Sequence, residues 1–257
     1  MNQSERRNYL IQKLLEEQPQ YAKMQIPGRC EEQKMLLRSL MNIRMPGKIS
    51  KEFQQIQDAY LAEENAAKGV VTPADMEELS PEIYLWKGDI TRLQVGAIVN
   101  AANSGMTGCY QPCHNCIDNC IHTYAGIELR NYCNELMLHQ GHEEPTGQAK
   151  ITPAFNLPCD YVIHTVGPIV RGRLTVEHER LLVSCYEACL RIAEENNIES
   201  IAFCCISTGV FMFPNERAAE LAVQTVKQYK DRTKSKIKVI FNVFKEEDER
   251  IYRGLLR

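Results

Sequence analysis

From Pro81 onwards, the chain alternates short apolar runs with helical segments. The runs are rich in β-branched residues and cover residues 83–87, 97–100, 161–166, 200–207 and 238–244. The helical segments are Ile117–Ala125, Ile127–His139, Val176–Asn197, Asn215–Lys230 and Glu247–Leu256. Strands that are apolar nearly throughout and that alternate with helices are typical of parallel sheets buried on both faces. The sequence therefore predicts an α/β fold with a mostly parallel sheet between helices.

The first 70 residues have a different pattern, with apolar side chains at helical spacing and no obvious site chemistry. The apolar positions are Leu10, Ile11, Leu14 and Leu15, then Leu36, Leu37, Leu40 and Met41, then Phe53, Ile56 and Tyr60. Such spacing indicates three amphipathic helices, and Ser50 is a suitable N-cap for the third. We expect residues 1–75 to form a helical extension packed on a main domain of residues 76–257.

Four loops follow predicted strands and contain many small and polar residues. They read GDIT at 88–91, AANSGMTG at 101–108, GPIVRGR at 167–173 and STGVFMFP at 207–214. In open α/β sheets, ligands bind at the carboxyl ends of the strands. Small residues let the backbone approach a ligand and offer N–H groups to phosphates, and a following helix N-terminus favours an anion. The loops thus predict a phosphate-bearing ligand, although the usual dinucleotide and P-loop patterns are absent.

The stretch from Gly105 to His122, GMTGCYQPCHNCIDNCIH, contains four cysteines and two histidines. The charged N-terminus lacks the apolar segment of a secretory signal, and no apolar run reaches the ~18–20 residues of a membrane span. We therefore expect a cytoplasmic protein, whose eleven cysteines are thiols or metal ligands rather than disulfides. The odd number also fits a fully paired disulfide framework badly.

The charge of the chain limits its partners. The formal net charge is -3, and no polybasic run occurs. Neither a nucleic acid nor an anionic membrane is therefore an expected partner. We expect a monomer.

Four motifs occur in the order that they have in macrodomains, which are ADP-ribose-binding modules. They are GDIT at 88–91, IVNAANS at 98–104, YVIHTVGP at 161–168 and ISTGVFMFP at 206–214. The chain therefore resembles a macrodomain over roughly residues 80–257, and its tail VIFNVFKEEDERIY resembles the last strand and helix of that fold. The resemblance implies a three-layer α/β/α fold with a mixed, mostly parallel sheet.

The cysteine-rich stretch from Gly105 to His122 and the asparagines before it resemble the hydrolytic branch of the family. CIDNCIH occupies the place of that branch's V-D-G-x-I-H pattern, so Asp118 matches its catalytic aspartate, and Asn103 matches the second asparagine of N-A-A-N. Cys109, His114 and Cys116 match the Cys, four residues, His, one residue, Cys pattern of the zinc-dependent macrodomains, a microbial group of protein-ADP-ribose hydrolases. A helical N-terminal extension is usual in that group. The resemblance implies one zinc ion per chain.

Three thiolate and imidazole ligands would leave the fourth position of zinc open for water or substrate, as in catalytic sites. Two alternatives stay open. Cys113 could complete a closed, structural Cys3His site, or Cys109, Cys113 and Cys116 could form a disulfide. We expect His122 to pack behind the loop and His164 to be a core histidine whose hydrogen bonds are satisfied.

The resemblance also implies the positions that bind ADP-ribose. They are Asp89, Ile90, Asn103, Ser207, Thr208, Gly209, Val210, Phe211 and Phe244. Asp89 would accept a hydrogen bond from the adenine amino group, and the less favoured alternative is an N-cap or turn residue. The backbone of residues 207–211 would hold the diphosphate, and Phe211 would pack on the proximal ribose. Phe244 would stack on adenine or, alternatively, lie in the core.

The predicted function is zinc-dependent removal of mono-ADP-ribose from protein side chains, with linkage through Asp, Glu or Ser favoured over Arg. Zinc would act as a Lewis acid or lower the pKa of a bound water toward ~7. A lipoyl-carrier protein is a candidate substrate by family analogy alone. The alternatives are an ADP-ribose reader with structural zinc and a hydrolase of small derivatives such as O-acetyl-ADP-ribose.

Overall fold

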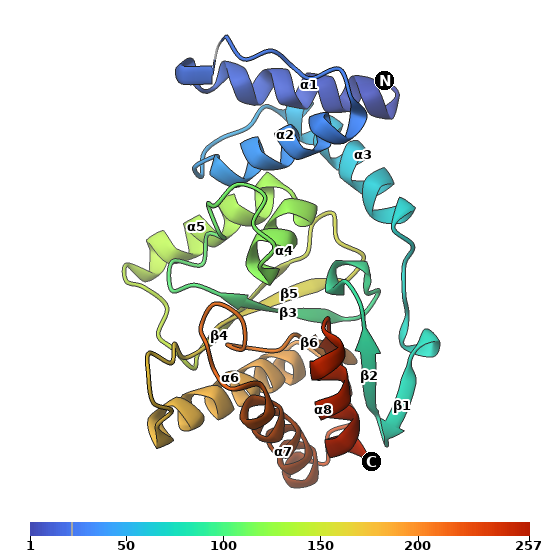
Figure 1. Cartoon of the computed structure of the whole chain (residues 1–257), viewed down its shortest axis with the longest axis vertical. Coiled ribbons are helices and arrows are strands. Elements are labelled where there is room, and N and C mark those ends of the chain that lie inside the picture. Colours follow the sequence, from blue (N-terminus) through green and yellow to red (C-terminus); the bar gives the residue numbers. More distant parts are fainter. Residues whose placement is uncertain (22) are drawn as a thin grey trace.

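The structure, a computed structural model that describes residues 1–21 and 23–257, contains a seven-stranded sheet in the order β1-β2-β7-β6-β3-β5-β4 (Figure 1). The strands are β1 (Glu77–Ser80), β2 (Ile83–Lys87), β3 (Ala97–Ala102), β4 (Ala149–Pro153), β5 (Tyr161–Val166), β6 (Ser200–Phe203) and β7 (Lys238–Val243). The five central strands are parallel, and the edge strands β1 and β4 are antiparallel to their neighbours. The predicted mixed, mostly parallel sheet is therefore confirmed.

Helices cover both faces of the sheet, which gives the three predicted layers (Figure 1). One face carries α4 (Ile117–Ala125) and α5 (Ile127–Gln140), and the other carries α6 (Val176–Glu195), α7 (Asn215–Thr233) and α8 (Glu246–Leu256). Each of these helices begins within one residue of its predicted start. None of the described helices is both long and apolar enough to cross a membrane.

One strand is shorter than the sequence predicts. The run 200–207 forms a strand only to Phe203, which pairs with Phe241 of β7. Beyond it, the Thr208 N–H bonds to the Cys205 carbonyl at 3.4 Å, and Ser207 has a left-handed backbone with a φ of 66°. A residue in that conformation cannot continue a strand. The placement of Cys204 and Cys205 within the strand was therefore wrong.

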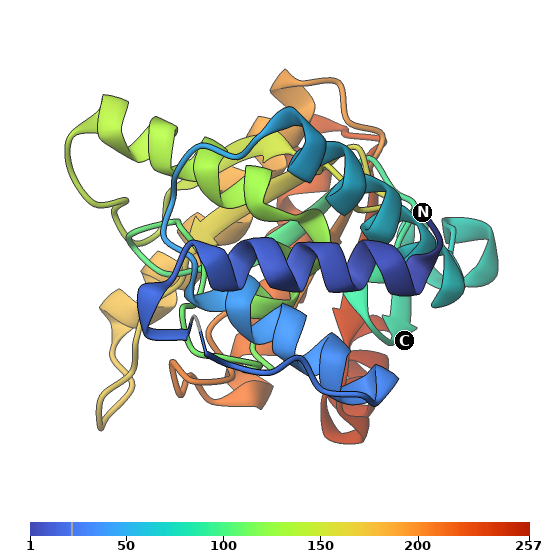
Figure 2. The same cartoon turned by 90° about the horizontal axis from the view of Figure 1, so that it is seen from above.

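The N-terminal segment forms three helices, α1 (Gln3–Glu16), α2 (Cys30–Ile43) and α3 (Lys51–Ala67), as its periodicity predicts. Their apolar faces form a second hydrophobic cluster, which also includes Ile127 at the start of α5. The Ser50 side chain caps α3 by accepting from the Phe53 N–H at 3.1 Å. Seen from two directions, these helices lie over α4 and α5, on the same side of the sheet (Figures 1 and 2).

Candidate functional site

The carboxyl ends of the parallel strands bring the predicted loops to one edge of the sheet. Lys87 at the end of β2 lies beside Val243 of β7, and Ala102 at the end of β3 lies beside Val166 of β5. The loops after β5 and β6 also contact each other, because the Val170 N–H donates to the Phe211 carbonyl at 2.8 Å. The four loops therefore line one rim, as expected from the parallel topology.

Asp118 and Asn103, the predicted catalytic pair, lie side by side on this rim. Asn103 follows β3, and its Nδ2 donates to Asp118 Oδ2 at 3.3 Å and to the Gly108 carbonyl at 3.1 Å. Asp118 lies in the first turn of α4 and is 5% exposed. Burial raises the pKa of Asp118 to about 6, against hydrogen bonds that lower it, so this carboxyl is mostly ionised at neutral pH.

The second partner of Asp118 is Asn100, which the sequence analysis missed. Asn100 is completely buried in β3, and its Nδ2 donates to Asp118 Oδ1 at 2.8 Å. The signal that could have found it is a single asparagine inside an otherwise apolar strand. Such a residue needs a buried hydrogen-bond partner.

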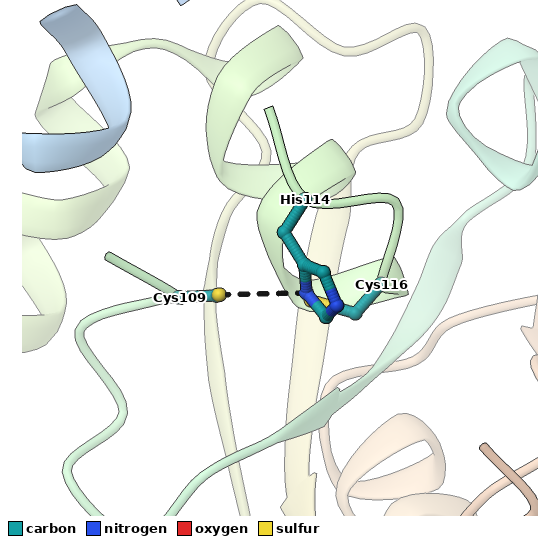
Figure 3. A group of neighbouring side chains, drawn as sticks. All are labelled: Cys109, His114 and Cys116. Atoms are coloured by element: carbon teal, nitrogen blue, oxygen red, sulfur yellow. Dashed lines mark hydrogen bonds between the residues drawn. The ribbon is translucent and has the colours of Figure 1, made fainter. Parts of the chain in front are cut away.

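Cys109, His114 and Cys116 converge at one end of the cysteine loop, which we define as residues 105–116 (Figure 3). Their three ligand atoms all lie within 4.8 Å of one another, and Cys109 Sγ is 3.7 Å from His114 Nδ1. Tetrahedral zinc with ordinary bond lengths places a sulfur and a nitrogen ligand about 3.6 Å apart. The donor set and its spacing therefore fit zinc. Burial raises the pKa of the Cys116 thiol to about 12, so binding of a metal there would release its proton.

Cys113 faces away from this group. Its Sγ lies 3.1 Å from Ser39 Oγ and 3.5 Å from the Met35 carbonyl, both in α2. The backbone at Cys113 is left-handed, with a φ of 51°, which turns the side chain of this residue toward the N-terminal helices. The cysteines of the loop are free thiols. The geometry thus supports neither the closed Cys3His arrangement nor the disulfide.

A second group that could hold a metal consists of His122, Cys133 and His164, all buried. His164 has partners for both ring nitrogens, at 3.0 Å from Asn100 Nδ2 and 3.0 Å from Thr152 Oγ1, as expected of a satisfied core histidine. Within the described residues, neither ring nitrogen of His122 has a hydrogen-bond partner. Its Nε2 lies 3.6 Å from Asp118 Oδ1, behind the loop as expected.

His164 should make the protein sensitive to acid. Burial lowers the pKa of His164 to about 3, whereas an unfolded histidine has a pKa of about 6.5. Below pH 6.5 the unfolded chain therefore binds a proton that the folded chain does not, and the free energy of unfolding falls as the pH falls. At about pH 4.5 the buried His164 should lower the free energy of unfolding by about 2–3 kcal/mol.

Denaturant unfolding of the parent and of His164→Gln at neutral pH and at about pH 4.5 measures this effect. Between the two pH values, the free energy of unfolding should fall by about 2–3 kcal/mol more in the parent than in His164→Gln. The exposed His142 is the control, since His142→Gln should follow the parent. Equal losses in the parent and His164→Gln would contradict the prediction.

The adenine end of the predicted site contains Asp89 and an unpredicted lysine. Asp89 Oδ1 accepts from Thr91 N at 3.0 Å, so this aspartate is the N-cap of a short 3-10 helix, Ile90–Arg92, as its alternative role required. Its Oδ2 lies 3.8 Å from Lys68 Nζ, just after α3. Burial lowers the pKa of Lys68 to about 8, although Asp89 opposes that shift. Ile90 is 1% exposed, so its side chain is a core contact and not a ligand contact.

The predicted diphosphate loop, residues 207–211, runs from the buried Ser207 to the exposed Gly209 and Val210. Ser207 is buried, and its Oγ has no hydrogen-bond partner within the described residues. A Cβ on Gly167 would approach that Oγ to 2.0 Å, which explains glycine at this position. Thr208 Oγ1 donates to the Cys205 carbonyl at 3.0 Å. Phe244 is 78% exposed, so it is not a core residue.

Comparisons with known proteins find relatives over most of the chain. The family model of the Macro domain matches residues 99–222. The chain is 58% identical over 260 residues to a protein-ADP-ribose hydrolase of Treponema medium, with 100% of both chains covered. It is 45% identical over 254 residues to a protein-ADP-ribose hydrolase of Staphylococcus aureus (strain MRSA252), covering 96% of this chain and 94% of that one.

Among solved structures, the Trypanosoma brucei macrodomain in complex with ADP-ribose matches with a TM-score of 0.67 and 26% identity. That match covers 86% of this chain and 95% of the Trypanosoma brucei chain. The fold, the rim loops and the full-length relatives lead to the same assignment. The chain belongs to the macrodomain family, in its branch of protein-ADP-ribose hydrolases.

Proposed function

We propose that this protein is a zinc-dependent hydrolase that removes mono-ADP-ribose from modified protein side chains. One observation carries the zinc part of the proposal. The Cys109, His114 and Cys116 ligand atoms converge immediately before Asp118, in the loop that follows Asn103. A structural zinc site would not need to lie beside Asn103 and Asp118. A protein that only binds ADP-ribose would need neither the zinc nor the Asp118 carboxylate.

ADP-ribose would lie along the rim, from Asp89 to the cysteine loop. The exposed Phe244 ring is free to stack on adenine, and the backbone of residues 207–211 would hold the diphosphate. Phe211 would contact the proximal ribose, which Asn103 and Asp118 would orient. The relatives described as protein-ADP-ribose hydrolases and the macrodomain solved with ADP-ribose support this ligand.

Hydrolysis breaks the bond between ADP-ribose and the acceptor oxygen, with hydroxide from water added on one side and a proton on the other. Zinc held by Cys109, His114 and Cys116 would supply Lewis acidity toward a substrate oxygen or a more acidic bound water. The ionised Asp118 carboxylate would orient the attacking water or accept its proton. Asn103 and Asn100 would keep the carboxylate directed at the ribose through their two amide hydrogen bonds.

We expect linkages through oxygen, to Asp, Glu or Ser, to be better substrates than linkages to Arg. An ester or ether oxygen is a suitable ligand for a Lewis acid. A guanidinium, in contrast, is cationic and has no acceptor lone pair to offer to a Lewis acid. A lipoyl-carrier protein remains a candidate acceptor by family analogy.

An assay on three sets of carriers tests the function. Carriers mono-ADP-ribosylated through Asp/Glu, Ser or Arg are incubated with the protein as isolated, after zinc chelation, and after zinc is added back. We expect release from the O-linked carriers, its loss on chelation, and its recovery with zinc but not with magnesium. Release that survives complete zinc removal would contradict the catalytic role of zinc.

The same assay separates the two alternatives. ADP-ribose binding without release from any carrier would identify a reader module. Release only from a small substrate such as O-acetyl-ADP-ribose would identify a hydrolase of free derivatives. Both results would contradict the proposed protein substrate.

A further inference from the structure

Arg38, in the middle of α2, reaches across to the cysteine loop. A single guanidinium nitrogen, Nη2, donates to the His114 carbonyl at 2.7 Å and to Asn119 Oδ1 at 3.0 Å. These contacts join residues that are 76 and 81 positions apart in the sequence. Hydrogen bonds from a charged donor are stronger than those between neutral groups. Arg38 therefore ties the N-terminal helices directly to a candidate ligand residue.

Asn119, the acceptor of Arg38, connects the other two candidate ligand residues. It is 1% exposed, and its Nδ2 donates to the Gln111 carbonyl at 2.9 Å and to the Cys109 carbonyl at 3.4 Å. Its backbone N–H donates to Cys116 Sγ at 3.4 Å. The amide nitrogen of this buried side chain is thus directed at the loop, and its oxygen accepts from Arg38 and, at 3.4 Å, from Thr123 Oγ1. Asn119 occupies the glycine position of the V-D-G-x-I-H pattern, and a glycine there would have no amide with which to hold the loop.

Two more residues of α2 hold the turn between the candidate ligands. Ser39 Oγ lies 3.1 Å from Cys113 Sγ, and Asn42 Oδ1 accepts from the Cys113 N–H at 2.9 Å. The other end of the Asn42 amide donates to Thr123 Oγ1 in α4 at 2.9 Å. The loop is therefore fixed on one side by α2 and on the other by α4.

We propose that Arg38 and Asn119 are positioning residues for zinc. Together they hold the His114 carbonyl, the Cys109 carbonyl and the Cys116 sulfur, so that the three ligand atoms are in place before the metal binds. The N-terminal helices are then part of the active site and not an appendage to it. This inference rests on the proposed zinc site. Partners that orient metal ligands are worth about 10–100-fold in metal affinity.

Zinc affinity, measured by competition with a chromophoric chelator, tests the inference. Arg38→Met and Asn119→Ala should each bind zinc about 10–100-fold more weakly than the parent. The zinc affinity of Arg38→Lys should lie between that of these two variants and that of the parent, because an ammonium is a point charge without the planar fork of Arg. The matched control is Arg29→Met at the start of the same helix, where the side chain is 83% exposed. That control should bind zinc as the parent does.

Two further measurements separate positioning from general damage to the fold. ADP-ribose binding by calorimetry should change far less than zinc affinity in all four variants, since none of the replaced side chains is among the predicted nucleotide-binding residues. Release activity of Arg38→Met should recover when zinc is raised to saturation, whereas damage to the fold would not be reversed by zinc. If Arg38→Met fails to fold, Arg38→Lys carries the same comparison.

Parental zinc affinity in both Arg38→Met and Asn119→Ala would overturn the inference. Hydrogen–deuterium exchange of zinc-free protein tests it even if the proposed function fails. The amides of residues 109–116 should exchange faster in these two variants than in the parent and in Arg29→Met, and equal exchange would overturn the positioning role. Full zinc content in Cys116→Ala would instead contradict the proposed zinc site.

Discussion

Asp118→Asn should release ADP-ribose about 10²- to 10⁴-fold more slowly than the parent, the range that one general acid–base group contributes. The reason lies in the partners of the carboxylate. Asn100 Nδ2 donates to Oδ1 and Asn103 Nδ2 donates to Oδ2, so both neighbours require an acceptor. A carboxylate accepts at both oxygens, whereas an amide offers only one acceptor. Asparagine at this position would face an N–H donor with its own NH2 group and would also lack the basic oxygen.

Single-turnover release from an O-linked carrier, together with calorimetric binding of ADP-ribose, measures the effect. Binding should change far less than the rate, because Asp118 is one of many contacts along the ligand. Asp160→Asn is a suitable control, since Asp160 is an exposed aspartate just before β5. A rate in Asp118→Asn equal to that of the parent would show that Asp118 does no proton work. Zinc content should be determined in parallel, because Asp118 is only two residues after Cys116.

The central strands were predictable because they are buried on both faces. Five apolar runs correspond to β2, β3, β5, β6 and β7. The two edge strands were missed. β1 reads EELS and β4 reads AKITP, and an edge strand can keep charged residues or proline because only one side of it is paired. Neither strand therefore contains the continuous apolar run on which the prediction depended.

The candidate site was predictable where its residues are close in sequence. Cys109, His114, Cys116 and Asp118 lie within ten residues, and the resemblance to zinc-dependent macrodomains distinguished them from the other cysteines and histidine of the same stretch. Arg38 belongs to a segment in which the sequence showed only amphipathic helices. Its contacts with the loop exist because α2 packs on α4, and helical periodicity predicts which face is buried but not what a polar side chain on it contacts.

Cys116→Ser should lower the zinc content from one ion per chain to nearly none and reduce release of ADP-ribose by at least about 100-fold, because loss of a ligand exceeds the 10–100-fold effect of an outer partner. Serine is the informative replacement here. Cys116 is the N-cap of α4, and its sulfur accepts from the Asn119 N–H. Serine is among the preferred N-caps, so the variant keeps the helix start while it loses the thiolate. Loss of zinc can then be attributed to the ligand.

The matched control is Cys113→Ser in the same loop. Cys113 contacts Ser39 and the Met35 carbonyl in α2, contacts that a hydroxyl can also make, so this variant should keep both zinc and activity. Zinc loss in Cys113→Ser would show that Cys113 closes the site after all. A full equivalent of zinc in Cys116→Ser would point to the buried group of His122, Cys133 and His164. The zinc content of Cys133→Ala then shows which of the two groups holds the ion, because this variant removes a thiol from the buried group and leaves the cysteine loop intact.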